Sequence, residues 1–165
     1  MILRNANVND AISISRVHYT CWHDTYPGLL DNNFLDKIHI DFWVNSTKDL
    51  ISNDKGNVYV LEEDNQIVGD IVFGKDRGVD NAGEIWALYV LPEYQKQGFG
   101  EMLINKSINT LSEKYSVIYV KVLLGNEKAL NFYKKIGFVD NDKIVEEQWG
   151  DFKFKNKILV YKIKK

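Results

Sequence analysis

The sequence has little of what marks secreted and membrane-spanning proteins. Cys21 is its only cysteine, so no internal disulfide can form, which is typical of a reducing compartment. No run of about 18 apolar residues is present. Met1 leads directly into a strand-like segment without the pattern of a signal peptide. These absences predict a soluble, cytoplasmic protein with no membrane partner.

A large charge of one sign is also absent. The 21 Lys and Arg residues are balanced by 23 Asp and Glu residues, which leaves a formal net charge of −2. A protein that binds nucleic acid by neutralising phosphates needs a basic excess, so we expect no nucleic-acid partner. The three histidines, His18, His23 and His39, do not share the spacing of metal ligands, and we expect no bound metal.

Length, composition and hydrophobic pattern predict one domain that covers residues 1–165. Apolar residues make up 45% of the sequence and charged residues 27%, the balance of an ordinary globular protein. The order of strands and helices predicts an α+β fold, in which helices cover the faces of a mixed sheet. We expect strands near residues 1–5, 58–62, 67–73, 84–91, 117–124, 138–145 and 154–163, one helix in each of the segments 7–26, 101–111 and 126–136, and one or two helices in the segment 31–52.

The segment from Glu84 to Gly100 is the most informative part of the sequence. Its first part, Glu84–Leu91, is rich in β-branched and aromatic residues and predicts a buried strand, which Pro92 ends because it cannot donate to a sheet. Gly98 and Gly100 follow and precede a helical pattern. Unpaired N–H groups in a helix's first turn attract anions, and glycines let a phosphate approach closely. This segment therefore predicts an anion site.

Two common phosphate-binding loops do not fit this segment. A P-loop ends in Gly-Lys-Ser/Thr, whereas Gly100 is followed by Glu101 and Met102. A dinucleotide-binding fingerprint needs a third Gly or Ala three residues after the second, where Leu103 stands. That fold also needs helices between nearly all of its strands, and here three strands follow one another. Both loops are excluded.

The loop instead resembles the acetyl-CoA loop of the GNAT acetyltransferase superfamily, whose signature is Gln/Arg-x-x-Gly-x-Gly/Ala. Here the residues are Gln95-Lys96-Gln97-Gly98-Phe99-Gly100. A second block, Asn126–Phe138, is similar to the superfamily's Asn-x-x-Ala-x-x-Phe-Tyr-x-x-x-Gly-Phe. The two blocks have the right order and separation, and the expected element order matches across nearly the whole chain.

The resemblance implies a mixed, mostly antiparallel central sheet of about seven strands with helices on both faces and a splayed strand pair. It also implies acetyl-CoA as the cosubstrate. Backbone amides from Gln97 to Gly100 would bind the pyrophosphate of coenzyme A, and the main chain of two strand residues would pair with the pantetheine arm. The cofactor-binding residues that it implies are Leu88, Val90, Gln95, Lys96, Gln97, Gly98, Phe99, Gly100 and Asn126.

Acetyl transfer needs a neutral amine, a stabilised carbonyl oxygen and a proton for the leaving thiolate. Tyr133, at the family's Phe-Tyr position, is the candidate general acid, and the alternative is a core tyrosine that packs its helix on the sheet. Glu84 resembles a glutamate of the histone-acetylating branch and is the candidate base, with a solvent-exposed carboxylate as the equal alternative. In family terms the Val90 N–H would stabilise the oxyanion.

The acceptor is expected to contact the first two helices. Trp22 and the turn that begins at Tyr26 resemble an aromatic stretch of bacterial small-molecule members, and Trp86 is a third candidate; the alternative for each is a core role. We therefore expect an N-acetyltransferase whose partner is a small-molecule primary amine. A protein N-terminus or lysine as acceptor, another acyl donor, a non-catalytic acyl-CoA sensor and a homodimer stay open, although Tyr133 and Glu84 together favour an enzyme.

Overall fold

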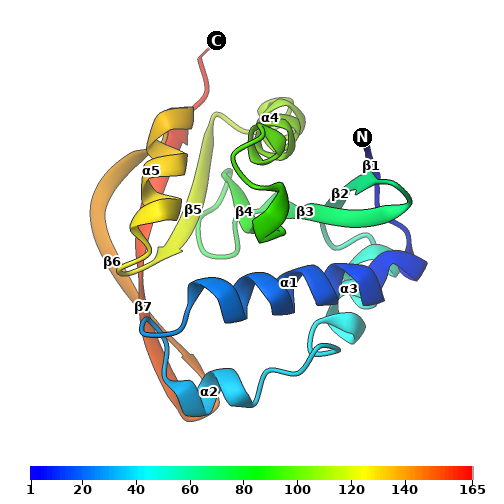
Figure 1. Cartoon of the computed structure of the whole chain (residues 1–165). Coiled ribbons are helices and arrows are strands. Elements are labelled where there is room, and N and C mark those ends of the chain that lie inside the picture. The colour runs from blue at the N-terminus through cyan, green and yellow to red at the C-terminus, as the bar shows by residue number, and fades with distance from the viewer. Residues whose placement is uncertain (165) are drawn as a thin grey trace.

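One mixed sheet organises the chain in the computed structural model, which describes residues 1–164 (Figure 1). The seven strands of these residues lie in the order β1-β2-β3-β4-β5-β7-β6, and β4 with β5 is the parallel pair. The strands are β1 (Ile2–Asn5), β2 (Asn57–Glu63), β3 (Gln66–Lys75), β4 (Gly83–Val90), β5 (Val117–Leu123), β6 (Val139–Trp149) and β7 (Phe152–Lys162). The α-helices are α1 (Ala11–Thr25), α2 (Asn32–Asp36), α3 (Val44–Ser52), α4 (Phe99–Ser112) and α5 (Glu127–Ile136).

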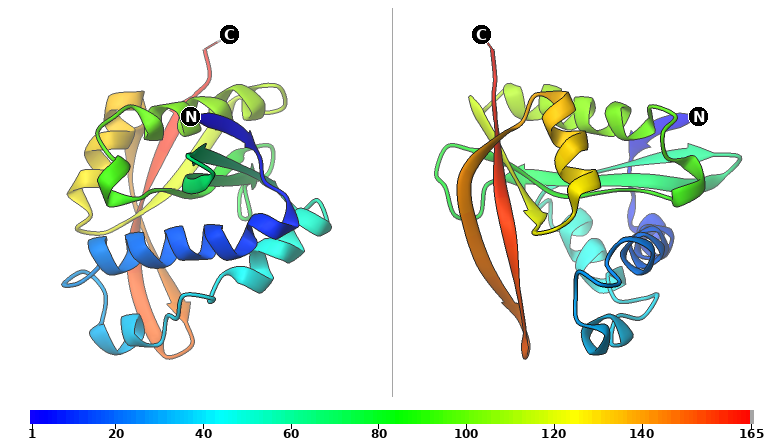
Figure 2. Two further views of the ribbon diagram at one scale, coloured as in Figure 1. Left: turned by 45° about the vertical axis from the view of Figure 1, so that its right-hand side comes forward. Right: turned by 60° about the vertical axis from the view of Figure 1, so that its left-hand side comes forward.

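Helices cover both faces of the sheet, as Figures 1 and 2 show, with α4 and α5 on one side and α1 to α3 on the other. Alternate side chains of the central strands point to opposite faces, so each face has its own core. Phe73 and Ile71 pack with Leu103 and Ile104 of α4. On the opposite face, residues of β2 and β3 pack with the apolar stripe of α1, and this second core contains Ile14, Val17, Cys21, Val58, Val60, Ile67 and Val72.

The hairpin between β2 and β3 fixes the register of the central strands. Asp64 and Asn65 form its turn with φ values of 49° and 62°, a conformation that Asp and Asn adopt more readily than other non-glycine residues. Leu61 pairs with Gly69 and the next β2 residue pairs with Ile67, which leaves Val68 as the extra residue of a bulge. The bulge lies beside Gly69, a residue that weakens a strand interior because it has no side chain to pack.

β4 and β5 separate after a short paired stretch. Their pairing covers Gly83–Ile85 on β4 and Ile118–Val120 on β5, although both strands continue further. The second half of β4 therefore has no strand partner on that side, and a cleft opens there. The predicted splayed pair and the predicted α+β fold with helices on both faces are confirmed.

The remaining differences from the predicted elements are local. The segment 31–52 forms two helices, α2 and α3, of which α2 has five residues. β6 continues to Trp149, beyond the expected end near residue 145, and forms a long hairpin with β7. Among residues 1–164, no helix is both long and apolar enough to cross a bilayer.

Candidate active site

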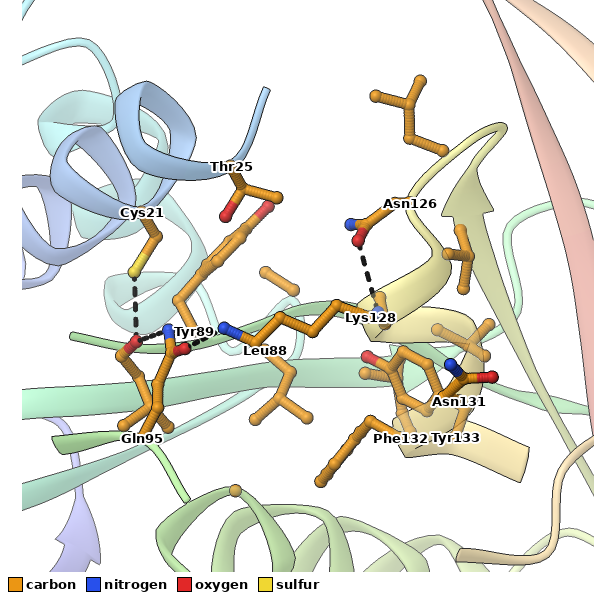
Figure 3. Close-up of a pocket in the computed structure, with 18 of the residues that line it drawn as sticks. Cys21, Thr25, Leu88, Tyr89, Gln95, Asn126, Lys128, Asn131, Phe132 and Tyr133 are labelled. Carbon is orange, nitrogen blue, oxygen red and sulfur yellow. Dashed lines mark hydrogen bonds between the residues drawn. The ribbon is translucent and has the colours of Figure 1, made fainter. Parts of the chain in front are cut away.

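A cleft of about 630 Å³ lies where β4 and β5 separate, between α1 on one side and α4 and α5 on the other (Figure 3). It brings together most of the cofactor-binding residues that the sequence predicted, although they come from four different elements and loops. The predicted cofactor-binding residues that line it are Leu88, Val90, Gln95, Lys96, Gly98, Gly100 and Asn126, and the predicted residues Tyr133, Tyr26 and Trp86 line it as well. Of the predicted loop residues, Gln97 and Phe99 do not line the cleft, and Phe99 packs against the core instead.

The exposed edge of β4 presents main-chain groups to this cleft. The Leu91 N–H donates to the Val68 carbonyl over 2.9 Å, and the same register pairs Tyr89 with Asp70. Residues of an antiparallel pair alternate between bonding to the partner strand and facing away from it. Tyr89 and Ala87 therefore bond to β3, whereas the main-chain groups of Leu88 and Val90 point toward the cleft.

The loop before α4 has the backbone shape of an anion site. Gly98, the residue before the helix, has a φ of +85°, and Lys96 has a φ of +60°. Within residues 1–164, no backbone N–H from Lys96 to Glu101 donates a hydrogen bond to another protein group. These donors lie at the N-terminus of a helix of 14 residues, where the dipole adds partial positive charge.

A small network at the mouth of the cleft includes two residues that sequence reasoning did not assign to it. The Val90 carbonyl accepts hydrogen bonds from the Gln95 Nε2 over 2.8 Å and from the Cys21 Sγ over 3.3 Å. Lys128 extends from α5 across the cleft and donates to the Gln95 Oε1 (Figure 3). Burial raises the pKa of the Cys21 thiol to about 12, so this thiol is a neutral donor. The position of Lys128 inside the Asn126–Phe138 block was the signal that could have identified it.

Tyr133 and Asn126 reach the cleft from α5. Asn126 begins this helix, and its side-chain oxygen accepts from the Ala129 N–H over 3.2 Å. Tyr133 is buried yet lines the cleft, and its hydroxyl makes no hydrogen bond to any residue that the structure describes. Burial raises the pKa of Tyr133 above its ordinary value, so the phenol is protonated at neutral pH.

A second pocket of about 330 Å³ adjoins the first, on the face of the sheet that α1 and α3 cover, and contains the predicted substrate residues. Trp22, Tyr26 and Trp86 all line it. Trp22 also belongs to the core beneath α2, where its indole N–H donates to the Tyr89 hydroxyl over 2.9 Å and its ring stacks on Trp149. The two pockets share part of their wall, and the shared residues are Tyr26, Ile85, Trp86, Ala87, Tyr89, Lys121 and Leu123.

Several pocket residues were missed because they come together only through the fold. Trp149 at the tip of the β6–β7 hairpin, Trp43 at the start of α3 and His18 of α1 all line the second pocket. His18 forms a hydrogen bond of 2.7 Å with Asp70. His23 lies outside the pocket and forms hydrogen bonds with the main-chain carbonyls of Tyr19 and Leu35. No local pattern in the sequence joins these positions.

Glu84 lies in the second pocket and is paired with Arg77. Its carboxylate accepts from the Arg77 main-chain N–H over 3.1 Å, from Nε over 3.3 Å and from Nη2 over 2.8 Å. Burial alone would raise the pKa of Glu84, but the hydrogen bonds and charge of Arg77 hold it below the ordinary value. Glu84 is four residues from Leu88, about 13 Å at the rise of a strand. The base role of Glu84 stays a prediction. It requires Arg77 to move away from the carboxylate and water to bridge the distance between Glu84 and Leu88.

Comparison with known proteins identifies the family. Residues 17–138 match the acetyltransferase (GNAT) family. The chain belongs to the GNAT family. The prediction of a GNAT N-acetyltransferase is thereby confirmed.

Relatives and solved structures agree with this assignment. The chain is 28% identical to a probable N-acetyltransferase of Mycobacterium tuberculosis over 138 residues. The aligned region covers 82% of this chain and 78% of the relative. It is 25% identical to an N-alpha-acetyltransferase of Sulfurisphaera tokodaii over 160 residues. This alignment covers 90% of this chain and 86% of the relative. The crystal structure of the PaiA N-acetyltransferase of Thermoplasma acidophilum, solved in complex with coenzyme A, has a TM-score of 0.77 at 21% identity and covers 98% of each chain.

Proposed function

We propose that this GNAT enzyme transfers the acetyl group of acetyl-CoA to a primary amine of a small molecule by direct attack. The observation that carries the proposal is the combination, in one cleft, of unpaired amides from Lys96 to Glu101 with the open edge of β4. The amides suit a pyrophosphate, and the β4 edge suits the amide groups of a pantetheine arm. Because neutral backbone donors hold the phosphates, the net charge of −2 is no obstacle.

Each of the two adjoining pockets holds one reactant. Acetyl-CoA occupies the cleft with its thioester near Leu88 and Val90, and the amine approaches from the second pocket across the shared wall that includes Tyr89. The Val90 carbonyl is engaged by Gln95 and Cys21, so the Val90 N–H is the group left for the developing oxyanion. The pantetheine arm pairs with the main chain of Leu88, and Lys128 moves aside to admit it.

The reaction forms a carbon–nitrogen bond and breaks the thioester carbon–sulfur bond. The amine nitrogen attacks the carbonyl carbon, and the thiolate of coenzyme A leaves. Tyr133 serves as the hydrogen-bond and proton donor to this sulfur, since its hydroxyl is free and protonated. The raised pKa makes complete transfer of the phenol proton less favourable, so the hydrogen bond carries most of the effect. The amine loses its proton to water.

A second candidate acceptor is the α-amino group at a protein N-terminus. The similarity to an N-alpha-acetyltransferase across 90% of the chain supports it. The second pocket supports the small-molecule acceptor instead, because Trp149 and Trp43 narrow it together with Trp22.

The test begins with calorimetric titration of acetyl-CoA, with S-acetylpantetheine as the short thioester that lacks the pyrophosphate together with the attached 3′-phosphoadenosine. We expect saturable binding of acetyl-CoA and binding of the short thioester at least about 100-fold weaker, since charge-assisted hydrogen bonds to the phosphates are lost. Equal affinities would contradict the pyrophosphate site.

Thiol release is then measured across alkyl amines, diamines and short peptides. Release with peptides alone would support the N-terminal acceptor, and coenzyme binding without release from any amine would support a sensor.

A further inference from the structure

Arg77 places a cation in the second pocket, which we call the acceptor pocket because the acceptor amine approaches from it. Its guanidinium bonds to the Glu84 carboxylate and lies 5.3 Å from the centre of the Trp86 ring. A carboxylate beside an aromatic ring is the chemistry that binds alkylammonium and guanidinium groups. All three residues line the second pocket, so this cation site faces the acceptor.

Trp86 is held in place by backbone rather than by adjustable side chains. A methyl group built on Gly56 would lie 2.4 Å from this ring, and one built on Gly74 would lie 2.7 Å from it. Both glycines therefore make room for the indole, and neither can be replaced by a larger residue without moving it. The ring packs directly on the main chain and forms part of the pocket wall.

Glu84 is the buried partner of this ion pair, and Arg77 is the exposed partner. Glu84 is in the paired part of β4, and its side chain is 3% exposed, whereas the Arg77 side chain is 63% exposed and comes from the loop between β3 and β4. Removal of Arg77 leaves a buried carboxylate beside an indole that packs on the main chain. The other charged pair of the pocket, Lys121 with Glu147 at 2.9 Å, is balanced in itself. The vacated site is therefore complementary to a cation.

We propose that Arg77 occupies the subsite for a second cationic group of the acceptor and is displaced when the acceptor binds. The inference rests on the proposed function and narrows its substrate class. The acceptor is a primary amine that also carries an ammonium or guanidinium group at the far end of a spacer. The spacer is several methylenes long, because Glu84 lies about 13 Å along β4 from Leu88, where the amine reacts.

The test compares α,ω-diaminoalkanes from butane to decane with monoamines of the same carbon count. In the wild type, kcat/KM is expected to be about tenfold higher for the best diamine than for its monoamine, from a cation–π contact and an ion pair together. Glu84→Gln is expected to remove this preference. Trp86→Phe is expected to reduce it, because Phe is the weaker cation–π partner. Equal kcat/KM for diamines and monoamines in the wild type would overturn the proposal.

Arg77→Met tests the displacement itself. It keeps an apolar stem over Trp86 and removes the competing charge, so KM for the diamines is expected to fall about threefold while KM for the monoamines stays unchanged. Lys75→Met is the matched control: it removes a cation next to the same loop, at a 64% exposed side chain outside both pockets, and no KM should change. A rise in KM for the diamines in Arg77→Met, or a loss confined to amines that carry a carboxylate, would overturn the proposal.

Misfolding of Arg77→Met and the absence of thiol release with every amine are two further outcomes, and each has its own reading. If Arg77→Met does not fold because Glu84 is left unpaired, the Glu84→Gln and Trp86→Phe preferences decide the question. If no amine releases thiol, the proposed function fails. In that case calorimetric titration with the diamine and monoamine pairs tests the subsite alone, and equal affinities reject it.

Discussion

His18 Nε2 lies 2.7 Å from Asp70 Oδ2, and both side chains are buried where α1 crosses β3. The second oxygen of Asp70 has no hydrogen-bond partner among the described residues. The His18 ring also contacts Tyr89 and Trp43, with ring centres 4.6 Å and 5.3 Å away. One buried polar contact thus joins the helix to the sheet and supports the wall of the acceptor pocket.

Loss of either partner of this pair should strongly destabilise the protein. Asp70→Ala leaves the buried His18 ring without its hydrogen-bond acceptor, and we expect the free energy of unfolding to fall by about 1–3 kcal/mol. Urea unfolding of Asp70→Ala, His18→Ala and the double variant measures it, and the double variant should lose much less than the sum. Lys135→Ala, which breaks an exposed pair with Glu101, is the control and should cost about 0.5 kcal/mol or less. Additive losses in the double variant would show that the two side chains do not act as a unit.

Tyr133→Phe should separate catalysis from coenzyme binding. The substitution removes only the hydroxyl, which has no protein partner among the described residues, so the fold and the affinity for acetyl-CoA should be unchanged. We expect kcat to fall on the order of 100-fold, the lower end for a lost proton donor. Steady-state kinetics and a coenzyme titration are the two measurements. Unchanged turnover would remove Tyr133 from the mechanism.

Gly98→Ala should weaken acetyl-CoA binding through backbone strain. Gly98 has a φ of +85° with nothing within 4 Å of an added methyl group, so the cost comes from conformation and not from a clash. We expect about 1 kcal/mol of lost stability together with weaker coenzyme binding, because the loop amides shift. Gly28→Ala is the matched control, since Gly28 has the same φ and the same open surroundings. Both variants should lose similar stability, and only Gly98→Ala should lose affinity; equal effects on affinity would reject the loop's role.

Cys21 should be almost unreactive in the folded protein. It is 4% exposed, and burial raises its pKa to about 12. At about pH 8 only one thiol in about ten thousand is a thiolate, the reactive form. A chromogenic disulfide reagent should therefore react slowly with the native protein, more slowly with acetyl-CoA present, and at once in urea. Fast, stoichiometric labelling of the native protein would contradict the burial of this thiol.

The same shift predicts a pH dependence of stability. Burial raises the folded-state pKa of Cys21 from its ordinary value of 9.0 to about 12, so the folded state favours the neutral thiol. The contribution of the neutral Cys21 thiol to the free energy of unfolding is complete below about pH 9. It is lost as the pH rises from there toward about 12. Cys21→Ala should therefore show a smaller decline in unfolding free energy across that alkaline range than the wild type does. An equal decline would mean that other groups account for it.

Local patterns in the sequence determined the elements and the coenzyme loop. Strand alternation, the stop at Pro92 and the glycines after it depend on neighbours along the chain, so they could be read without the fold. The two blocks Gln95–Gly100 and Asn126–Phe138 identified the family, because a backbone anion site needs particular residues at fixed spacing.

Tertiary structure alone decided what surrounds those blocks. Arg77 on Glu84, Lys128 on Gln95 and Asp70 on His18 each join residues whose contact depends on how strands and helices pack, and no spacing along the chain encodes them. Helix and strand periods are properties of the backbone that every short segment carries by itself. The chemistry of the acceptor pocket is a property of the packed molecule, since its charges and rings meet only after the sheet has formed.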